Sequence, residues 1–285
     1  MVSSCICNKK RLVFLKLINI FCFCFFAITA SCQNNLINSN GSTISERFLV
    51  PKGYNRLPSQ DNSFAYFLQQ QVLKPHGSLV HLYNCSEKQN KVAAAVLSVD
   101  VGKKDLQQCA DAVMRLRAEF LYKTKQYDKL HFKFTNGFNA LYSKWREGYR
   151  VSVNGNKVNW VKTTKESTSY NSFKDYLQIV FTYAGTASLA KELKSVNIND
   201  MQIGDVFIKG GSPGHAVIVL DMAEDKKTNK KLFIIAQSYM PAQDIHILIN
   251  DNNSTLSPWY ELNTQATSIS TPEWNFYSSQ LMRFE

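Results

Sequence analysis

Two long apolar runs in the C-terminal third of the chain constrain its fold most strongly. HAVIVLDM (215–222) and LFIIAQSY (232–239) are separated by the charged segment AEDKKTNKK. Apolar runs of this length, bounded by turn residues, predict two long strands. A Gly-Gly-Ser-Pro-Gly corner at 210–214 comes directly before the first run. We therefore expect His215 to begin this strand, at the mouth of a small cleft.

An amphipathic stretch at 104–124 predicts the clearest helix, with Asp105 as its N-cap. Apolar residues recur along it at spacings of three and four, which places them on one face. That stripe consists of Leu106, Cys109, Val113, Leu116 and Phe120. β-rich runs at 93–102 and 129–138 flank the helix, so we predict a strand-helix-strand unit.

A second helix is predicted at 172–185 by its inward-facing apolar residues. Ser172, followed three residues later by Asp175, resembles a capping box, and Gly185 is expected to end the helix. On this pattern Ser172 is an N-cap.

The N-terminus has the pattern of a targeting segment rather than of folded structure. Basic residues at 9–11 precede a long apolar run that ends in small residues at Cys32. ITASC resembles a bacterial lipobox, which predicts a signal peptide at 1–31, lipidation of Cys32 and a polar tether at 32–60. A signal peptide cut near Ala30 and a single membrane-spanning anchor are the alternatives.

The charge and cysteine content narrow the range of partners. The whole chain carries a formal charge of +11; four cations and no acids lie in 1–31, which leaves +7. This surplus favours anionic envelope polymers, but the Lys/Arg stripe with aromatic residues that nucleic-acid binding requires is not found. Seven cysteines become three, and Cys85 and Cys109 could pair in an oxidising compartment. We expect no cofactor and no metal site, since the sequence has no HExxH motif, Cys/His cluster or phosphate-binding glycine loop.

The order helix, GDVFI, GHAVIVLD, charged turn, FIIAQS resembles the catalytic half of NlpC/P60 and CHAP-type cysteine peptidases, which are papain-like enzymes that cut peptidoglycan peptides. The resemblance covers roughly residues 170–240. It implies that His215 is the base and that Gln237 or Ser238 orients it. A helix N-terminus stabilises the thiolate in such enzymes, a histidine accepts the proton, and a third group fixes the imidazole.

The nucleophile departs from that pattern, because Asn171-Ser172 stands where the family has Asp-Cys. A hydroxyl needs a stronger base arrangement than a thiol. Cys109 is the other possible nucleophile and follows the pair Gln107-Gln108, but it also lies on the apolar stripe, where burial would make it inert. Both residues therefore remain candidates beside their structural interpretations.

The chain from about 45 to 285 also resembles the exported proteins of Bacteroidetes-type bacteria grouped as domain of unknown function 4846. The motifs that carry this resemblance are VLSVDVGKKDLQQCADAVMRLRAEFLY, FTYAGTASLAKEL, GDVFIKGGSPGHAVIVLDMA, AQSYMPAQDIHIL, SPWYEL and TPEW. It implies no activity.

Polar residues after the second long strand predict a binding surface, because loops at strand ends often carry sites. They are Ser238, Tyr239, Gln243, Asp244 and His246. The alternative is a polar turn that satisfies its own backbone.

Together these patterns predict an α+β protein with a strand-helix-strand half (61–150) and a papain-like half with antiparallel strands (151–285), forming one unit over 61–285. We expect an exported lipoprotein, anchored to a membrane of the cell envelope on its periplasmic or surface face. Its expected activity is hydrolysis of wall peptides or a related amide by His215, Gln237 and either Cys109 or Ser172. The alternative is a non-catalytic module that binds a peptidoglycan peptide or envelope glycan in a degenerate cleft. The oligomeric state is left open.

Overall fold

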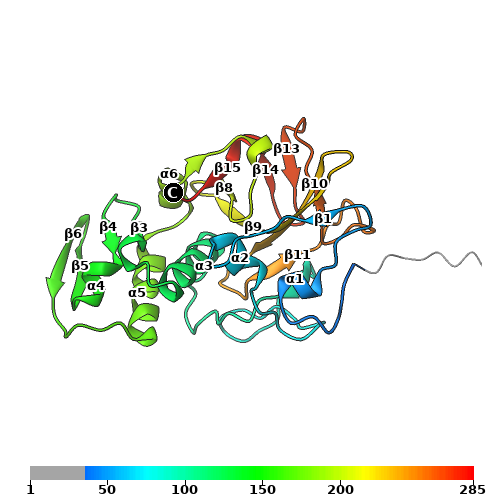
Figure 1. Cartoon of the computed structure of the whole chain (residues 1–285). Helices are drawn as coiled ribbons and strands as arrows, with labels where there is room; N and C mark the ends of the chain where they lie inside the picture. The colour runs from blue at the N-terminus through cyan, green and yellow to red at the C-terminus, as the bar shows by residue number, and fades with distance from the viewer. Residues whose placement is uncertain (1–35) are drawn as a thin grey trace, which may run out of the picture. The chain divides into compact units, whose positions relative to one another are not determined.

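The two long apolar runs are strands, as predicted, and they form the centre of a large antiparallel sheet. A computed structural model describes residues 36–285, so the predicted signal peptide and Cys32 lie outside the described residues. Strand β9 (His215–Asp225) pairs with β10 (Lys230–Gln237) through the charged turn. The fold is α+β (Figure 1).

The sheet contains nine strands within residues 36–285, and every pairing in it is antiparallel. Its order is β2-β11-β10-β9-β8-β15-β7, with β1 paired to β9 and β12 to β10. The remaining strands of the sheet are β2 (Ala93–Val96), β11 (His246–Leu248), β8 (Val206–Lys209), β15 (Leu281–Arg283), β7 (Lys194–Ser195), β1 (Asn55–Arg56) and β12 (Tyr260–Glu261).

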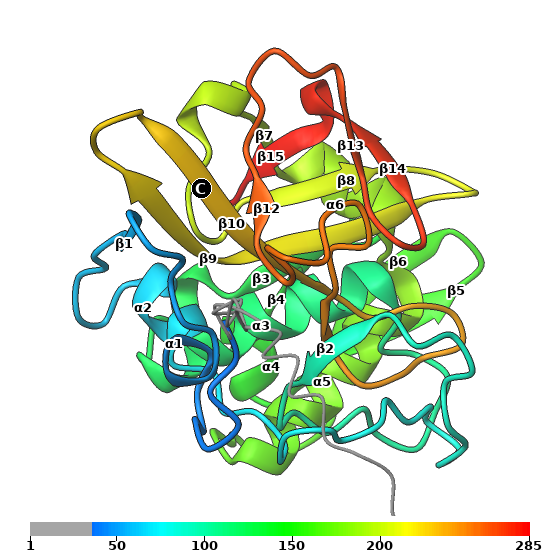
Figure 2. The same ribbon diagram turned by 90° about the vertical axis from the view of Figure 1, so that its right-hand side faces the viewer.

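Strand β9 is buried on both faces, because successive side chains of a strand point in opposite directions. Ala216, Ile218 and Leu220 belong to the main core, which includes helix α3 (Cys109–Lys123). Val217 and Val219 belong to a second core on the other face, with the hairpin of β13 (Ser268–Ser270) and β14 (Asn275–Tyr277). Helix α3 and this hairpin lie on opposite sides of β9 (Figure 2).

Helix α3 begins later than its sequence pattern indicates. Gln108, not Asp105, is the N-cap, and Asp111 completes a capping box with it. Asp105 instead accepts hydrogen bonds from the Ala242 amide at 2.6 Å and from Gln108 Nε2 at 3.0 Å. A long-range contact has replaced the local cap, and the helix therefore starts with Cys109.

The predicted strand-helix-strand unit is wrong, although its elements exist. Strand β2 is an edge of the large sheet, whereas β3 (His131–Lys133) pairs only with β4 (Asn139–Leu141) in a separate small sheet. A second hairpin, of β5 (Tyr149–Asn154) and β6 (Lys157–Lys162), lies beside it. These hairpins, α4 (Tyr142–Arg146) and α5 (Tyr170–Tyr183) form the left-hand part of Figure 1.

The N-terminal segment 36–60 is part of the folded unit, so the predicted tether is wrong for these residues. Helix α1 (Ile44–Arg47) and the following turn bury Ile44 and Phe48 completely. Arg56 of β1 donates to the buried carboxylate of Asp221 at 2.8 Å. The short helices α2 (Phe64–Gln69) and α6 (Thr186–Glu192) complete the α-helices.

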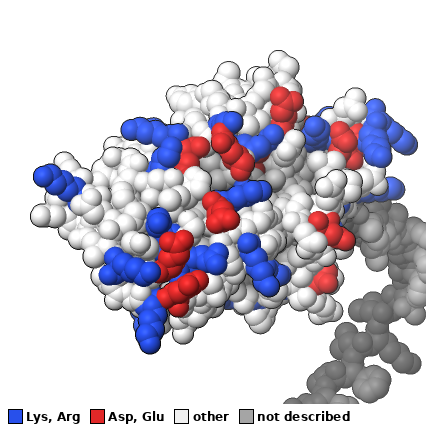
Figure 3. All heavy atoms as spheres, turned by 60° about the vertical axis from the view of Figure 1, so that its left-hand side comes forward, with Lys and Arg blue, Asp and Glu red and all other residues white. Residues whose placement is uncertain are grey.

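Charge is dispersed over the face shown in Figure 3, where Lys and Arg groups lie among Asp and Glu groups. Within residues 36–285, no helix has the length and hydropathy needed to span a bilayer.

Candidate functional site

His215 begins strand β9, and its position is set by the glycine before it. A Cβ atom on Gly214 would lie 2.4 Å from both Thr186 Oγ1 and the Gly211 carbonyl oxygen, so no side chain fits there. The close approach of the corner to α6 thus determines where β9 starts. The glycine-rich corner, read from sequence as a turn, is also a packing contact.

Gln237, the last residue of β10, binds His215 directly. His215 Nε2 lies 2.8 Å from Gln237 Oε1, and both side chains are 1% exposed. Gln237 Nε2 donates to Glu273 Oε2 at 2.6 Å, which turns the amide oxygen toward the histidine. His215 therefore carries its proton on Nε2, and Nδ1 keeps the lone pair that a general base needs.

His246, on the neighbouring strand β11, supports the same orientation. Its Nδ1 donates to the Asp244 carbonyl oxygen at 2.9 Å, and its Nε2 lies 3.3 Å from Gln237 Nε2. Gln237 thus donates to both His246 and Glu273 while it accepts from His215. The two histidines, predicted separately as a base and as a binding residue, lie in one hydrogen-bonded network.

The charge of this network comes from Glu273, in the loop between β13 and β14. Lys88 Nζ lies 2.8 Å from Glu273 Oε1, and Asn90 Nδ2 donates to the same oxygen at 3.0 Å. Burial raises the pKa of Glu273, but the ion pair with Lys88 and the hydrogen bonds lower it further, so the net shift is downward. Glu273 is therefore ionised, and it holds Gln237.

His215 is covered by aromatic rings, so the expected position at the mouth of an open cleft is wrong. Ring centroids of Tyr239, Trp274 and Phe276 lie 4.9, 5.3 and 5.9 Å from that of the imidazole. Lys88 Nζ lies 5.1 Å from the Tyr239 centroid and so packs against this cover. Burial lowers the pKa of His215 to about 4, which keeps the ring neutral at physiological pH.

Cys109 approaches the same strand from the other side. It is the first residue of α3, it is 7% exposed, and the backbone N–H of Ala216 stabilises its thiolate. Burial raises the pKa of Tyr239, and negative charge on Glu273 or Cys109 would add to this shift. Although Ala216 and His215 are neighbours, no hydrogen bond joins Cys109 Sγ to the imidazole among the contacts of these described residues.

The thiol is protonated at neutral pH in this arrangement. Burial raises the pKa of Cys109 to about 11; the N–H groups of Ala110 and Ala216 oppose this, and the nearby charge of Asp111 adds to it. Neutral thiol and neutral imidazole thus lie on either side of the His215–Ala216 peptide. Cys85 is free and exposed, and Cys109 is free as well, so the two do not form a disulfide.

Ser172 lies away from this cluster. It occupies the first turn of α5, where Ser169 is the N-cap, and its Oγ lies 3.1 Å from Trp145 Nε1. The side chain is buried and packs between α4 and α5. The prediction that Ser172 caps the helix is wrong by three residues, and the structure does not bring this hydroxyl to His215.

The other predicted binding residues have structural partners. Ser238 Oγ lies within hydrogen-bonding distance of the Gln107 and Gln243 carbonyl oxygens, at 2.9 and 2.8 Å, so its one hydroxyl hydrogen can be donated to either. The side chain thus connects the end of β10 with the segment before α3. Asp244 forms an ion pair with Lys74 at 2.7 Å. Tyr239 is the member of the set that borders His215.

Sequence reasoning did not identify Glu273 or Lys88 as parts of the site. Glu273 and Trp274 lie in the TPEW motif, which was a possible signal, but they are 58 and 59 positions from His215 in the chain. In the part of the chain that the structure describes, no three His, Cys, Asp or Glu side chains gather in an arrangement suited to a metal ion.

The fold and this cluster define a class: α+β proteins with one large antiparallel sheet and a buried Cys, His and Gln where a helix begins against two central strands. Within it, the chain belongs to the family described as domain of unknown function (4846), which matches residues 44–283. No curated protein and no solved structure matches the chain.

Proposed function

We propose that this chain is an exported, lipid-anchored thiol hydrolase that cleaves amide bonds in peptides of the cell envelope, in the manner of papain-like enzymes of the NlpC/P60 type. Cys109 is the nucleophile, His215 the base and Gln237 the group that orients it. The observation that supports this proposal is a contact between two groups. Cys109, at the N-terminus of α3, lies against the backbone N–H of Ala216, which is the residue after His215. Ser172 has no role in the reaction.

The proposed reaction starts from the neutral pair. His215 Nδ1 takes the proton of the thiol as Sγ attacks the amide carbonyl carbon, and the imidazolium returns this proton to the leaving amine. The resulting thioester is hydrolysed by a water molecule that gives a proton to Nδ1, after which the free acid leaves and the thiol is restored. Gln237 Oε1 accepts from Nε2–H throughout, which stabilises the imidazolium.

Access and contact require a movement of the cover. Tyr239 and Trp274 are partly exposed and enclose the ring, so their displacement would admit substrate to the imidazole. The imidazole would also have to turn toward the α3 face to reach the thiol of Cys109. The Cys109 thiol and the His215 imidazole are both neutral before substrate binds. We therefore favour a mechanism in which His215 removes the thiol proton after substrate has bound, rather than one that starts from a thiolate–imidazolium pair.

A second function is favoured by one observation: His215 points to the face of β9 opposite to α3 and is 1% exposed. If this closed state persists with ligand, the chain is a non-catalytic envelope module that binds a wall peptide or glycan on its surface.

The test is incubation of the full chain with purified peptidoglycan, followed by mass spectrometry of the soluble peptides. We expect fragments with new amino termini, and at least a 100-fold loss of their rate of release in Cys109→Ser and in His215→Ala. Cys85→Ser is the matched control, because Cys85 is the other free cysteine among the described residues, and it should retain full activity. Full activity of Cys109→Ser would refute the thiol mechanism, whereas binding without cleavage by the unmodified chain would favour the module.

A further inference from the structure

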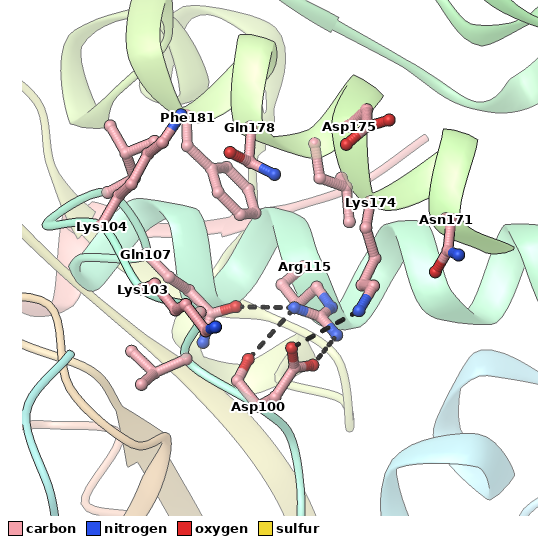
Figure 4. A pocket seen from close by; sticks show the side chains of 14 residues that line it. Asp100, Lys103, Lys104, Gln107, Arg115, Asn171, Lys174, Asp175, Gln178 and Phe181 are labelled. Atoms are coloured by element: carbon pink, nitrogen blue, oxygen red, sulfur yellow. Dashed lines mark hydrogen bonds and ion pairs between the residues drawn. The ribbon is translucent and has the colours of Figure 1, made fainter. Parts of the chain in front are cut away.

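A cavity of about 460 Å³ lies beside the start of α3, between residues 100–107 and helix α5. We call it the loop–α5 pocket (Figure 4). Its lining loop continues through Gln107 and Gln108 directly into Cys109. A volume in this range accommodates a small peptide fragment rather than a single ion.

The pocket holds an unpartnered buried donor. Gln107 is 1% exposed, and its Oε1 accepts from Arg115 Nη1 at 2.9 Å, which directs Nε2 away from the arginine. In the part of the chain that the structure describes, Nε2 has no hydrogen-bond partner. A buried donor without an acceptor is destabilising by about 1–3 kcal/mol, so such groups in folded proteins often await a ligand or a water molecule.

The charged side chains that line the pocket are mostly positive, but the carboxylate of Asp175 on α5 also lines it and makes no ion pair with the described residues. Lys103 and Lys104 line it and make no ion pair, whereas Lys174 lies 3.9 Å from Asp100. Arg115 is fully engaged, with Asp100 at 2.8 Å and Glu119 at 2.7 Å. The guanidinium, the group best suited to bidentate phosphate recognition, is thus already occupied, and two lysines and an amide remain for a ligand.

Helix α5 supplies the opposite wall with two kinds of surface. Leu177 and Phe181 are apolar, while Asn171 and Gln178 present side-chain amides that make no hydrogen bond within residues 36–285. An apolar stretch flanked by free amides and cations is complementary to a short peptide with an aliphatic part, backbone amides and a carboxylate. Asn171, which directly precedes Ser172 in the chain, lines this wall.

We propose that the loop–α5 pocket binds an acidic peptide through its carboxylate, with Lys103, Lys104 and Gln107 Nε2 as donors. The inference rests on the proposed function, because it makes this pocket, whose lining loop ends two residues before Cys109, a binding site for the substrate that Cys109 attacks. It narrows the substrate class to peptides with a free carboxylate near the bond that is cleaved.

Binding is measured in the full chain carrying Cys109→Ser, so turnover does not enter. The probe is the dipeptide acetyl-Ala-Glu, with two free carboxylates, titrated into protein labelled with ¹⁵N-glutamine and followed through the Gln107 side-chain NH₂ resonances. These are assigned by their loss in Gln107→Leu. We expect a saturable shift of this NH₂ group, at least tenfold weaker binding of the uncharged analogue acetyl-Ala-Gln-amide, and a similar loss in Lys103→Gln/Lys104→Gln.

The matched control is Lys226→Gln/Lys227→Gln, which removes the same charge from the exposed turn after β9 and should leave the affinity unchanged. An unmoved Gln107 resonance at saturating dipeptide would overturn the proposal. So would inorganic phosphate that binds as tightly as the dipeptide with the same dependence on Lys103 and Lys104. Because the cleavage assay uses Cys109 and this assay does not, either proposal can fail alone.

Discussion

At the residue scale, the side-chain amide of Gln237 determines which ring nitrogen of His215 carries the proton. Gln237 can offer His215 only its oxygen, because Glu273 and His246 take its two hydrogens. Both histidines are consequently neutral hydrogen-bonding groups within a buried network. A network of this kind is stable only while every member keeps its protonation state.

The two histidines should make stability depend on pH. Burial lowers the pKa of His215 and of His246 to about 4 in the folded protein, against 6.5 ordinarily. The unfolded chain then binds more protons between pH 6.5 and 4, so the free energy of unfolding falls as the pH falls through this window and is fully retained above it. Urea denaturation of the His246→Gln variant should show a slope smaller by up to about 1.4 kcal/mol per pH unit than that of the unmodified chain.

The exposed His76 provides the control, since His76→Gln should leave that slope unchanged. Equal slopes for the His246→Gln variant and the unmodified chain would show that His246 is not held neutral by the fold.

At the element scale, the start of α3 is organised by contacts from distant segments. The Ser238 hydroxyl contacts the Gln107 carbonyl oxygen, and the Ala242 N–H donates to Asp105. The guanidinium of Arg115 donates to Asp100, Glu119 and the side-chain oxygen of Gln107. Arg115 therefore fixes the loop that leads to Cys109.

Removing that guanidinium should destabilise the whole protein. Arg115→Met leaves Gln107 Oε1 without its partner and leaves Glu119 with the Tyr170 hydroxyl but without a cation. Breaking a largely buried ion pair in this way costs about 3–5 kcal/mol. We expect a loss near the lower end of this range, since Asp100 is exposed and Glu119 is partly accessible. Chemical denaturation measures it.

Lys123→Met, an exposed position in the last turn of the same helix, is the comparison and should change stability by less than about 0.5 kcal/mol. Equal stabilities of the two variants would mean that Arg115 does not hold the loop.

At the scale of the whole molecule, the first described residues complete the core. The segment 36–60 contributes Ile44 and Phe48 to the main core and Arg56 as the ion-pair partner of the fully buried Asp221. The folded unit therefore begins before residue 61.

A chain that starts at Asp61 should fail to fold cooperatively. It would leave Asp221 without its cation, at about 3–5 kcal/mol, and would uncover the apolar surface that Ile44 and Phe48 cover. Circular dichroism melting is the measurement, with a chain that starts at Gln33 as the comparison. A cooperative transition of the shorter chain at an unchanged temperature would restore the predicted tether over 32–60.

Local pattern correctly indicated the elements that a short stretch determines. The runs after His215 and Leu232 are strands because they are continuously apolar, and α3 and α5 are helices because their apolar residues recur every three or four positions. Helix starts were less predictable, since Asp105 and Ser172 have side chains suited to capping but make tertiary hydrogen bonds instead.

The sequence by itself determined the α+β class and the two central strands, whereas the pairing of His215 with Gln237 or Ser238 was an expectation from the resemblance to papain-like peptidases. Periodicity and side-chain chemistry are local properties, so a stretch of ten residues carries them. The tertiary structure alone decided that Cys109 rather than Ser172 meets the His215 strand, that Glu273 holds Gln237, and that aromatic rings close over the imidazole. These outcomes depend on contacts between residues tens to more than a hundred positions apart, which burial and hydrogen bonding select only when the whole chain has packed.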